Sequence, residues 1–191
     1  MGARDRLIDS AIALMRCNGI AGTGIAQLLE HSGISRRSIY LNFPGGKSEL
    51  IAEATRAAGK ATSALMRTVT ASTDLASTIA AFPAMWREVL VASDFAAGCP
   101  IAAAALGRSE SPEAADVAGE TFQEWENILA TRLEAEQVEP ATARALATTI
   151  IAAVEGAVVM SLATRSTAPL ERVGRQMADL VALHTATTTA V

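Results

Sequence analysis

The stretch from Thr23 to Leu50, TGIAQLLEHSGISRRSIYLNFPGGKSEL, constrains the fold more than any other part of the chain. The apolar residues at 25, 28 and 29 fall on one helical face, and those at 39 and 43 lie four apart on the next. Gly33 tolerates the left-handed backbone that a tight corner between helices needs. Thr23 and Ser35 are placed as N-caps, because their hydroxyls can accept from free amides of a first turn. The stretch therefore predicts two short helices joined by a tight turn.

The second of these helices, expected over 36–42, begins with a concentration of hydrogen-bond donors. Arg36, Arg37 and Ser38 lie in its first turn, where a recognition helix presents side chains to base edges in the major groove. Donors that can reach phosphate oxygens, and so fix register rather than read sequence, follow at Tyr40, Asn42 and Lys47. The pattern indicates a helix-turn-helix that binds double-stranded DNA.

Charge is distributed unevenly along the chain. The net charge of −4 would by itself argue against a nucleic-acid partner. Residues 1–60, however, carry eight Lys/Arg and five Asp/Glu, a net charge of +3, whereas residues 61–191 carry eight and fifteen, a net charge of −7. The positive charge thus gathers on the helix-turn-helix segment, and affinity for DNA is expected to fall as salt rises.

The turn and second helix also carry the signature of a known family. Its elements occur in order as Gly33-Ile34-Ser35, Tyr40-Leu41-Asn42-Phe43, Lys47 and Leu50. At these residues the chain resembles the tetracycline-repressor-like (TetR) family of bacterial regulators. Similarity to the subgroup of multidrug-operon repressors rests on Thr23-Gly24-Ile25, Pro44-Gly45-Gly46 and Gly98-Cys99-Pro100-Ile101. Many of that subgroup carry an amide at the position of Ala26 and a histidine at that of Asn42, so contacts through those side chains are not carried over.

The resemblance implies a ligand-responsive transcriptional repressor that acts as a homodimer on operator DNA. It extends the set of residues expected to contact DNA to Thr23, Gly24, Ser35 and Leu41. It also implies a small-molecule effector, apolar or aromatic, whose binding releases the operator. The predicted architecture is all-α, with a three-helix DNA-binding domain at 1–46, a larger helical effector-binding and dimerisation domain at 47–184, and a disordered tail at 185–191.

The remaining sequence shows helical periodicity punctuated by Gly and Pro, without sustained period-two alternation. A first helix is expected to end at Asn18, before Gly19. The other expected helices span approximately 47–71, 75–92, 101–106, 112–133, 140–165 and 169–184, with Ser111 capping the one that begins at Pro112. Along the first of these, the apolar stripe is Leu50, Ala54, Ala58, Ala61, Leu65 and Val69.

The last two helices are expected to form the dimer interface, as two helical hairpins paired about a two-fold axis. Small or adaptable residues would allow close approach at Ala152, Ala153, Gly156, Ala157 and Met160. A second stripe is Val173, Met177, Leu180 and Val181. The alternative is that both faces close the monomer's own core.

An effector pocket is expected in the larger domain, because aromatic side chains and flexible thioethers suit flat apolar ligands. The candidates are Met66, Phe82, Met85, Trp86, Phe122, Trp125 and Met160. Ordinary core packing is the default interpretation of each. Glu155 is added because a buried carboxylate in an apolar helix is costly unless it meets a cation, an arginine or water.

Other classes of function have less support. Two cysteines and two histidines at these spacings predict no disulfide framework, metal site or cofactor, and the sequence is not that of an enzyme. A reducing cytoplasm fits. No cleavable signal is expected, since the N-terminal segment carries charges at Arg4, Asp5, Arg6 and Asp9. No membrane span is expected, since Glu155 interrupts the apolar run at 146–163. A redox-responsive regulator acting through Cys99 and a helical scaffold that does not bind DNA are the alternatives.

Overall fold

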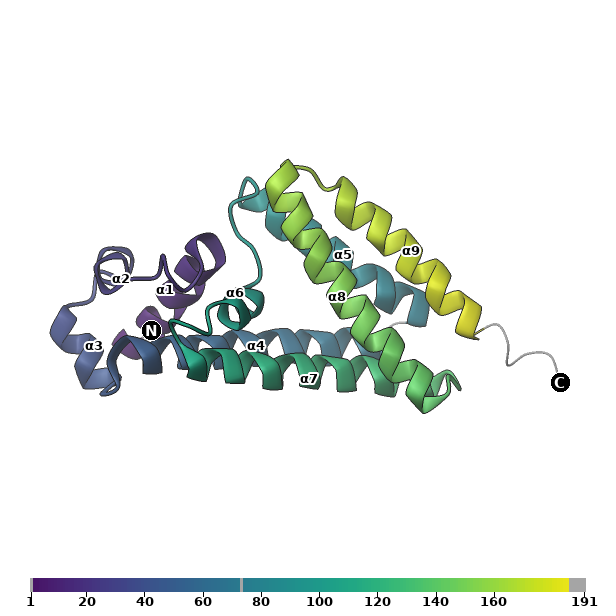
Figure 1. Ribbon diagram of the computed structural model, residues 1–191, viewed down its shortest axis with the longest axis horizontal. Coiled ribbons are helices and arrows are strands. Elements are labelled where there is room, and N and C mark those ends of the chain that lie inside the picture. Colours follow the sequence, from purple (N-terminus) through teal and green to yellow (C-terminus); the bar gives the residue numbers. More distant parts are fainter. Residues whose placement is uncertain (1, 73, 186–191) are drawn as a thin grey trace. The chain divides into compact units, whose positions relative to one another are not determined.

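The computed structural model describes residues 2–72 and 74–185, and no strand occurs among them (Figure 1). The helices are α1 (Ala3–Asn18), α2 (Ile25–Ser32), α3 (Arg36–Asn42), α4 (Gly46–Ser72), α5 (Leu75–Ala92), α6 (Pro100–Leu106), α7 (Pro112–Ala135), α8 (Pro140–Thr164) and α9 (Ala168–Thr185). The all-α prediction is confirmed. Thr185 ends α9, and the rest of the tail expected to be disordered lies outside the described residues.

Packing divides the described residues into two compact units. Within the described ranges, unit 1 is formed from residues 2–62 and 98–122, and unit 2 from residues 63–72, 74–97 and 123–185. Helices α4 and α7 contribute residues to both units, so the division by packing falls within helices rather than in a loop. The functional boundary expected between residues 46 and 47 stays a prediction.

The core of unit 1 joins α1 to the two helices of the helix-turn-helix. Helix α1 packs against α2, α3 and α6. The largest side chains of this core are all but inaccessible to solvent: Leu7, Met15, Leu28, Ile39, Phe43, Leu50 and Ile51. Burying each of them stabilises the fold by about 1.5–3 kcal/mol. This core holds α3 by its inner face and leaves its outer face in solvent.

The stripe predicted along α4 is correct only for its first turns. Leu50, Ala54 and Ala58 are buried, but Ala61 is exposed and Leu65 is 46% exposed. In the later turns the buried side chains are instead Ser63 and Met66. The buried side chains of α4 therefore do not follow one continuous apolar repeat along the whole helix. The sequence contains no signal for this break in the repeat.

Two helix starts differ in how their caps are made. Ser111 directly precedes α7 as predicted, and its carbonyl accepts from Ala115 N at 3.2 Å, but it forms no side-chain cap, because its buried hydroxyl has no hydrogen-bond partner. Glu139 caps α8, since its carboxylate accepts from Ala141 N at 3.0 Å and Thr142 N at 2.9 Å. These backbone hydrogen bonds lower the pKa of Glu139.

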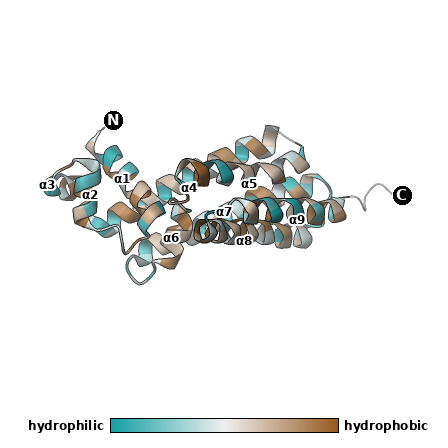
Figure 2. Cartoon of the chain, turned by 90° about the horizontal axis from the view of Figure 1, so that it is seen from above, coloured by the Kyte–Doolittle hydropathy of each residue, from teal (hydrophilic) through white to brown (hydrophobic). Residues whose placement is uncertain are grey.

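Unit 2 is built around α9, which packs against both α5 and α8. Gly174 of α9 lies against Pro83 of α5, where a Cβ would come within 3.2 Å of the proline ring. Helices α5 and α8 have the length and composition of membrane spans, with 39% of each apolar window buried. In Figure 2 hydrophobic residues are interspersed with hydrophilic ones in the part of the chain that holds α5, α8 and α9. The packing of α5 and α8 on α9 is that of core helices.

Candidate nucleic-acid interface

The corner of the helix-turn-helix forms as its sequence predicts. Gly33 has φ +65° and ψ 19°, the left-handed region, and its amide donates to Leu29 O at 3.0 Å. Ser35 is the N-cap of α3, because its hydroxyl accepts from Ser38 N at 3.2 Å. The Ser35 and Ser38 hydroxyls also lie 3.0 Å apart and share a hydrogen bond. The start of α3 is therefore fixed by local interactions.

The N-cap predicted at Thr23 is wrong. Its side chain is fully buried, and its hydroxyl donates to Gly19 O at 2.7 Å. Gly24 is the residue that precedes α2 in the N-cap position, without a side-chain hydrogen bond. The short turn after α1 directs Thr23 inward, which sequence spacing from α2 cannot reveal. A DNA contact through the Thr23 side chain stays a prediction that this burial disfavours.

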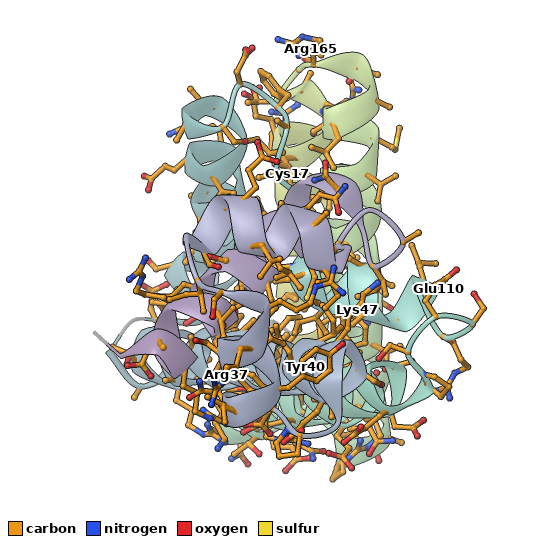
Figure 3. The ribbon with its side chains drawn as sticks, turned by 90° about the vertical axis from the view of Figure 1, so that its left-hand side faces the viewer. Cys17, Arg37, Tyr40, Lys47, Glu110 and Arg165 are labelled. Atoms are coloured by element: carbon orange, nitrogen blue, oxygen red, sulfur yellow. The ribbon has the colours of Figure 1, made fainter. Side chains whose placement is uncertain are left out.

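The outer face of α3 is exposed along its length. Arg36 and Arg37 are exposed, Tyr40 is 50% exposed and Leu41 is 70% exposed. Figure 3 shows Arg37 and Tyr40 on this face, at the end of unit 1 that is turned toward the viewer. The inner side chains of Ile39 and Phe43 have no exposed surface. Helix α3 is thus held by two apolar anchors and presents a mixed basic, aromatic and aliphatic surface.

Asn42 and Lys47 are less available than the sequence suggests. Both are half-buried. Asn42 Nδ2 donates to Ser38 O at 2.8 Å, and Lys47 Nζ donates to Ile20 O at 3.3 Å. Each can reach a phosphate only by sharing or releasing that hydrogen bond. Their predicted phosphate contacts therefore stay predictions.

Most arginines of unit 1 have structural partners. Arg4 pairs with Glu53 at 2.6 Å and lies 5.2 Å from the Phe43 ring centroid. Arg6 Nη2 donates to Ser32 O at 2.6 Å, next to the Gly33 corner. The remaining partners are Gly98 O for Arg16, Asp116 for Arg108 and Glu53 for Arg56. Only the last of these pairs, three residues apart on one helix, has a local sequence signal.

Arg36 and Arg37, by contrast, form no ion pair with any carboxylate among the described residues. Two unpaired guanidinium groups therefore stand at the N-terminal turn of α3, where backbone amides also favour an anion. The available positive charge is more localised than the count of basic residues implies. Contact between this turn and phosphates or bases of DNA stays a prediction.

The residues predicted to line an effector pocket differ in burial, and whether they share one site stays a prediction. Met66, Trp86 and Trp125 are buried, Phe82, Met85, Phe122 and Glu155 are half-buried, and Met160 is 55% exposed. Phe122 belongs to unit 1 and the others to unit 2. Trp125 Nε1 donates to Ser63 Oγ at 3.2 Å, so the indole is part of a polar contact within unit 2.

Two open grooves of about 440 Å³ occur in unit 2, and neither is lined by a residue of the predicted set. One lies between α5 and α9, with Pro83, Leu170 and Gly174 among its lining residues and Arg87 and Arg175 at its edge. The other lies between α8 and α9. The effector site stays a prediction.

The predicted dimer stripes divide by exposure. Ala152 and Gly156 are exposed and Met160 is 55% exposed, whereas Ala153, Val173, Met177 and Leu180 are half-buried. Ala157 and Val181 are 1% and 4% exposed, so placing them at the interface is wrong, because they fill the core of their own protomer. Val159 was not among the predicted residues, but it is 57% exposed and follows Ala152 by two helical turns.

The cysteines give no support to redox control. Cys99 is buried and is the N-cap of α6, with its Sγ 3.5 Å from Ala102 N. Cys17 is exposed on α1. Within the part of the chain that the structure describes, no group of His, Cys, Asp and Glu side chains is arranged to hold a metal ion.

Known proteins match both parts of the chain. Residues 7–54 match the family of bacterial regulatory proteins of the tetR type, and residues 76–176 match the C-terminal domain of LmrA/YxaF-like transcriptional regulators. An uncharacterized HTH-type transcriptional regulator of Mycobacterium tuberculosis is 32% identical over 186 residues, which cover 94% of each chain. HTH-type transcriptional regulator LmrA of Bacillus subtilis is 26% identical over 181 residues, covering 94% of this chain and 96% of LmrA.

Solved structures show the same fold. Regulatory protein TetR from Rhodobacter sphaeroides superposes with a TM-score of 0.84 at 18% identity, over 93% of this chain and 97% of that one. A TetR-family regulator from Agrobacterium tumefaciens has a TM-score of 0.82 at 24% identity, over 93% and 96% of the two chains. Together with this fold, the two family matches and the 32% identical relative assign the chain to the TetR family of DNA-binding bacterial transcriptional regulators.

Proposed function

We propose that the protein is a cytoplasmic homodimeric repressor that leaves its operator when a small apolar or aromatic effector binds unit 2. The observation that carries the DNA-binding part is the first turn of α3, where Arg36 and Arg37 are exposed and unpaired. The other arginines of unit 1 are engaged with carboxylates or carbonyls. Guanidinium groups left free on a recognition helix are suited to bidentate contacts with guanine or phosphate.

Support for a homodimer comes from the exposed face of α8. Ala152, Gly156, Val159 and Met160 are exposed and fall on one helical face. Small residues beside flexible apolar ones allow a second helix to approach closely. One α3 contacts too few base pairs to specify an operator. Two copies in a homodimer recognise two half-sites and so read a longer sequence.

Support for an effector comes from the size and apolar character of unit 2 and from its match to LmrA/YxaF-like C-terminal domains. An effector needs to favour the state that does not bind DNA by about 1–3 kcal/mol to weaken operator binding about five- to 150-fold. Helix α4 begins next to the helix-turn-helix and contributes residues to both units, so it is the proposed route of coupling.

The proposal is tested with fluorescence anisotropy on a duplex from the DNA that flanks the protein's own gene, with a scrambled competitor at fixed physiological salt. The variant Arg36→Ala/Arg37→Ala should fold normally and bind DNA about 10- to 1,000-fold more weakly. Its salt dependence should also weaken, by a slope of about 0.9 for each phosphate that the variant no longer neutralises. Arg87→Ala/Arg175→Ala removes the same charge from exposed positions of unit 2 and serves as the matched control.

Equal reductions in affinity in the two double variants would mean that overall charge, not α3, governs binding, and would refute the assignment of the interface. For the effector, a panel of apolar aromatic compounds is titrated first against the free protein by calorimetry and then against the protein–DNA complex. Compounds that bind the protein should raise its apparent Kd for DNA. If every compound that binds leaves the complex intact, release by such effectors is refuted.

A further inference from the structure

Leu41 is a large aliphatic side chain of α3 that the core of unit 1 does not use. It is 70% exposed, whereas Ile39 and Phe43 on the inner face are fully buried. A single exposed leucine is ordinary in a folded protein and needs no explanation by itself. The position of Leu41 is what carries meaning, because it lies on the face that presents Arg37 and Tyr40.

Residues 37, 40 and 41 are three and four apart and therefore project from the same side of α3. The side chains of Ser35, Ser38 and Asn42 already take part in hydrogen bonds within this segment. Ser35 accepts from Ser38 N, and the two hydroxyls share a hydrogen bond at 3.0 Å. Asn42 Nδ2 donates to Ser38 O at 2.8 Å. The exposed groups available to a base edge are therefore the first-turn arginines, the Tyr40 phenol and the Leu41 side chain.

The Leu41 side chain has neither a donor nor an acceptor, so it cannot read the hydrogen-bonding edge of any base. The major groove displays one kind of apolar group to such a side chain, which is the C5-methyl of thymine. We propose that Leu41 is a specificity-determining residue that contacts the methyl group of one thymine in each operator half-site. This rests on the proposed docking of α3 in the major groove.

The helix geometry also restricts where this thymine lies. Arg37 and Leu41 are separated by four residues, or about 6 Å along the helix axis. One base step of B-DNA is about 3.4 Å, so the thymine lies within about two base pairs of the base that Arg37 contacts. The proposal therefore predicts a thymine at a fixed short distance from the Arg37 contact in both half-sites.

The experiment starts from an operator obtained by selection from random duplexes or from the DNA that flanks the gene. Each thymine is replaced in turn by uracil, which removes the C5-methyl and leaves the hydrogen-bonding edge unchanged. Removal of one buried methyl should weaken binding about fourfold for one half-site and about fifteenfold when both are substituted. Leu41→Ala should weaken binding to the thymine operator and should show no further weakening with uracil at that position.

Leu106→Ala is the matched control, since Leu106 is 85% exposed on α6 of the same unit. This variant should keep the full uracil sensitivity of the unmodified protein. Specific binding that no uracil substitution weakens, or a Leu41→Ala variant that remains as sensitive as the control, would overturn the assignment of Leu41 and leave the regulator itself intact. Failure to bind any selected duplex specifically would overturn the proposed operator binding, and the role of Leu41 with it.

Discussion

Two glycines give a direct test of whether the exposed face of α8 is a dimer interface. Gly119 of α7 and Gly156 of α8 are both inside helices and exposed, and a Cβ built on either meets no heavy atom within 4 Å. Within one protomer the two sites are therefore equivalent. The proposed homodimer distinguishes them, because it places a second copy of the chain against Gly156 and nothing against Gly119.

The expected energies follow from these surroundings. Replacing glycine by alanine in a helix interior stabilises the fold by about 0.8–1 kcal/mol, so Gly119→Ala should raise Tm by about 2–4 °C. At Gly156 a larger side chain meets the partner helix, and overpacking costs about 1–3 kcal/mol. A two-fold interface contains the substitution twice, so Gly156→Leu should weaken the dimer by at least about 2 kcal/mol, or about 30-fold in Kd.

The assay is sedimentation equilibrium over a range of protein concentrations, together with thermal unfolding. Gly119→Leu is the control and should keep the monomer–dimer equilibrium of the unmodified protein. Gly156→Leu should shift toward monomer while its helical content stays the same. If the two leucine variants have the same dimer Kd, the exposed face of α8 is not the dimer interface, and the argument from its small residues fails.

The capping hydroxyl of α3 should matter locally: Ser35→Ala should cost about 1 kcal/mol in the free energy of unfolding and speed amide hydrogen exchange in the first turn of α3, and unchanged exchange would refute its role as a cap. The hydrogen bond from Arg67, and then that from Ser63, lowers the pKa of Glu124, so its contribution to stability is present at neutral pH and disappears as acid protonates the folded carboxylate. The free energy of unfolding is measured by urea titration at neutral pH and below about pH 4. It should decrease less on acidification in Glu124→Gln than in the unmodified protein. An equal decrease in the two proteins would contradict the pairing. A thiol-specific reagent should modify Cys17 in the folded protein and Cys99 only after unfolding, whereas comparable rates would reopen redox control through Cys99.

The helix-turn-helix was predictable because its determinants are local. Gly33 meets the backbone requirement of the corner, Ser35 caps the next helix, and the spacing of Ile39 and Phe43 defines the buried side of α3. Each of these effects acts within one or two helical turns. The family signature and the helix bounds were accessible for the same reason.

Tertiary packing decided which charges are free. The count of basic residues treats Arg4, Arg6 and Arg37 as equals, but the first two are engaged with Glu53 and the Ser32 carbonyl across long sequence separations. Partners remote in sequence leave no periodic signal.

Tertiary packing also determined which face of α8 is buried. This helix is apolar on nearly all sides, so hydropathy cannot indicate which side is the core. The structure buries Ala157 and leaves Val159 and Met160 exposed, although all three suit either environment. By itself the sequence determined an all-helical chain with a basic reading helix, because helix periodicity and caps are local. Contacts with α9 and α5 determined which surfaces remain for partners, because an apolar side chain becomes a core residue only when a neighbouring helix covers it.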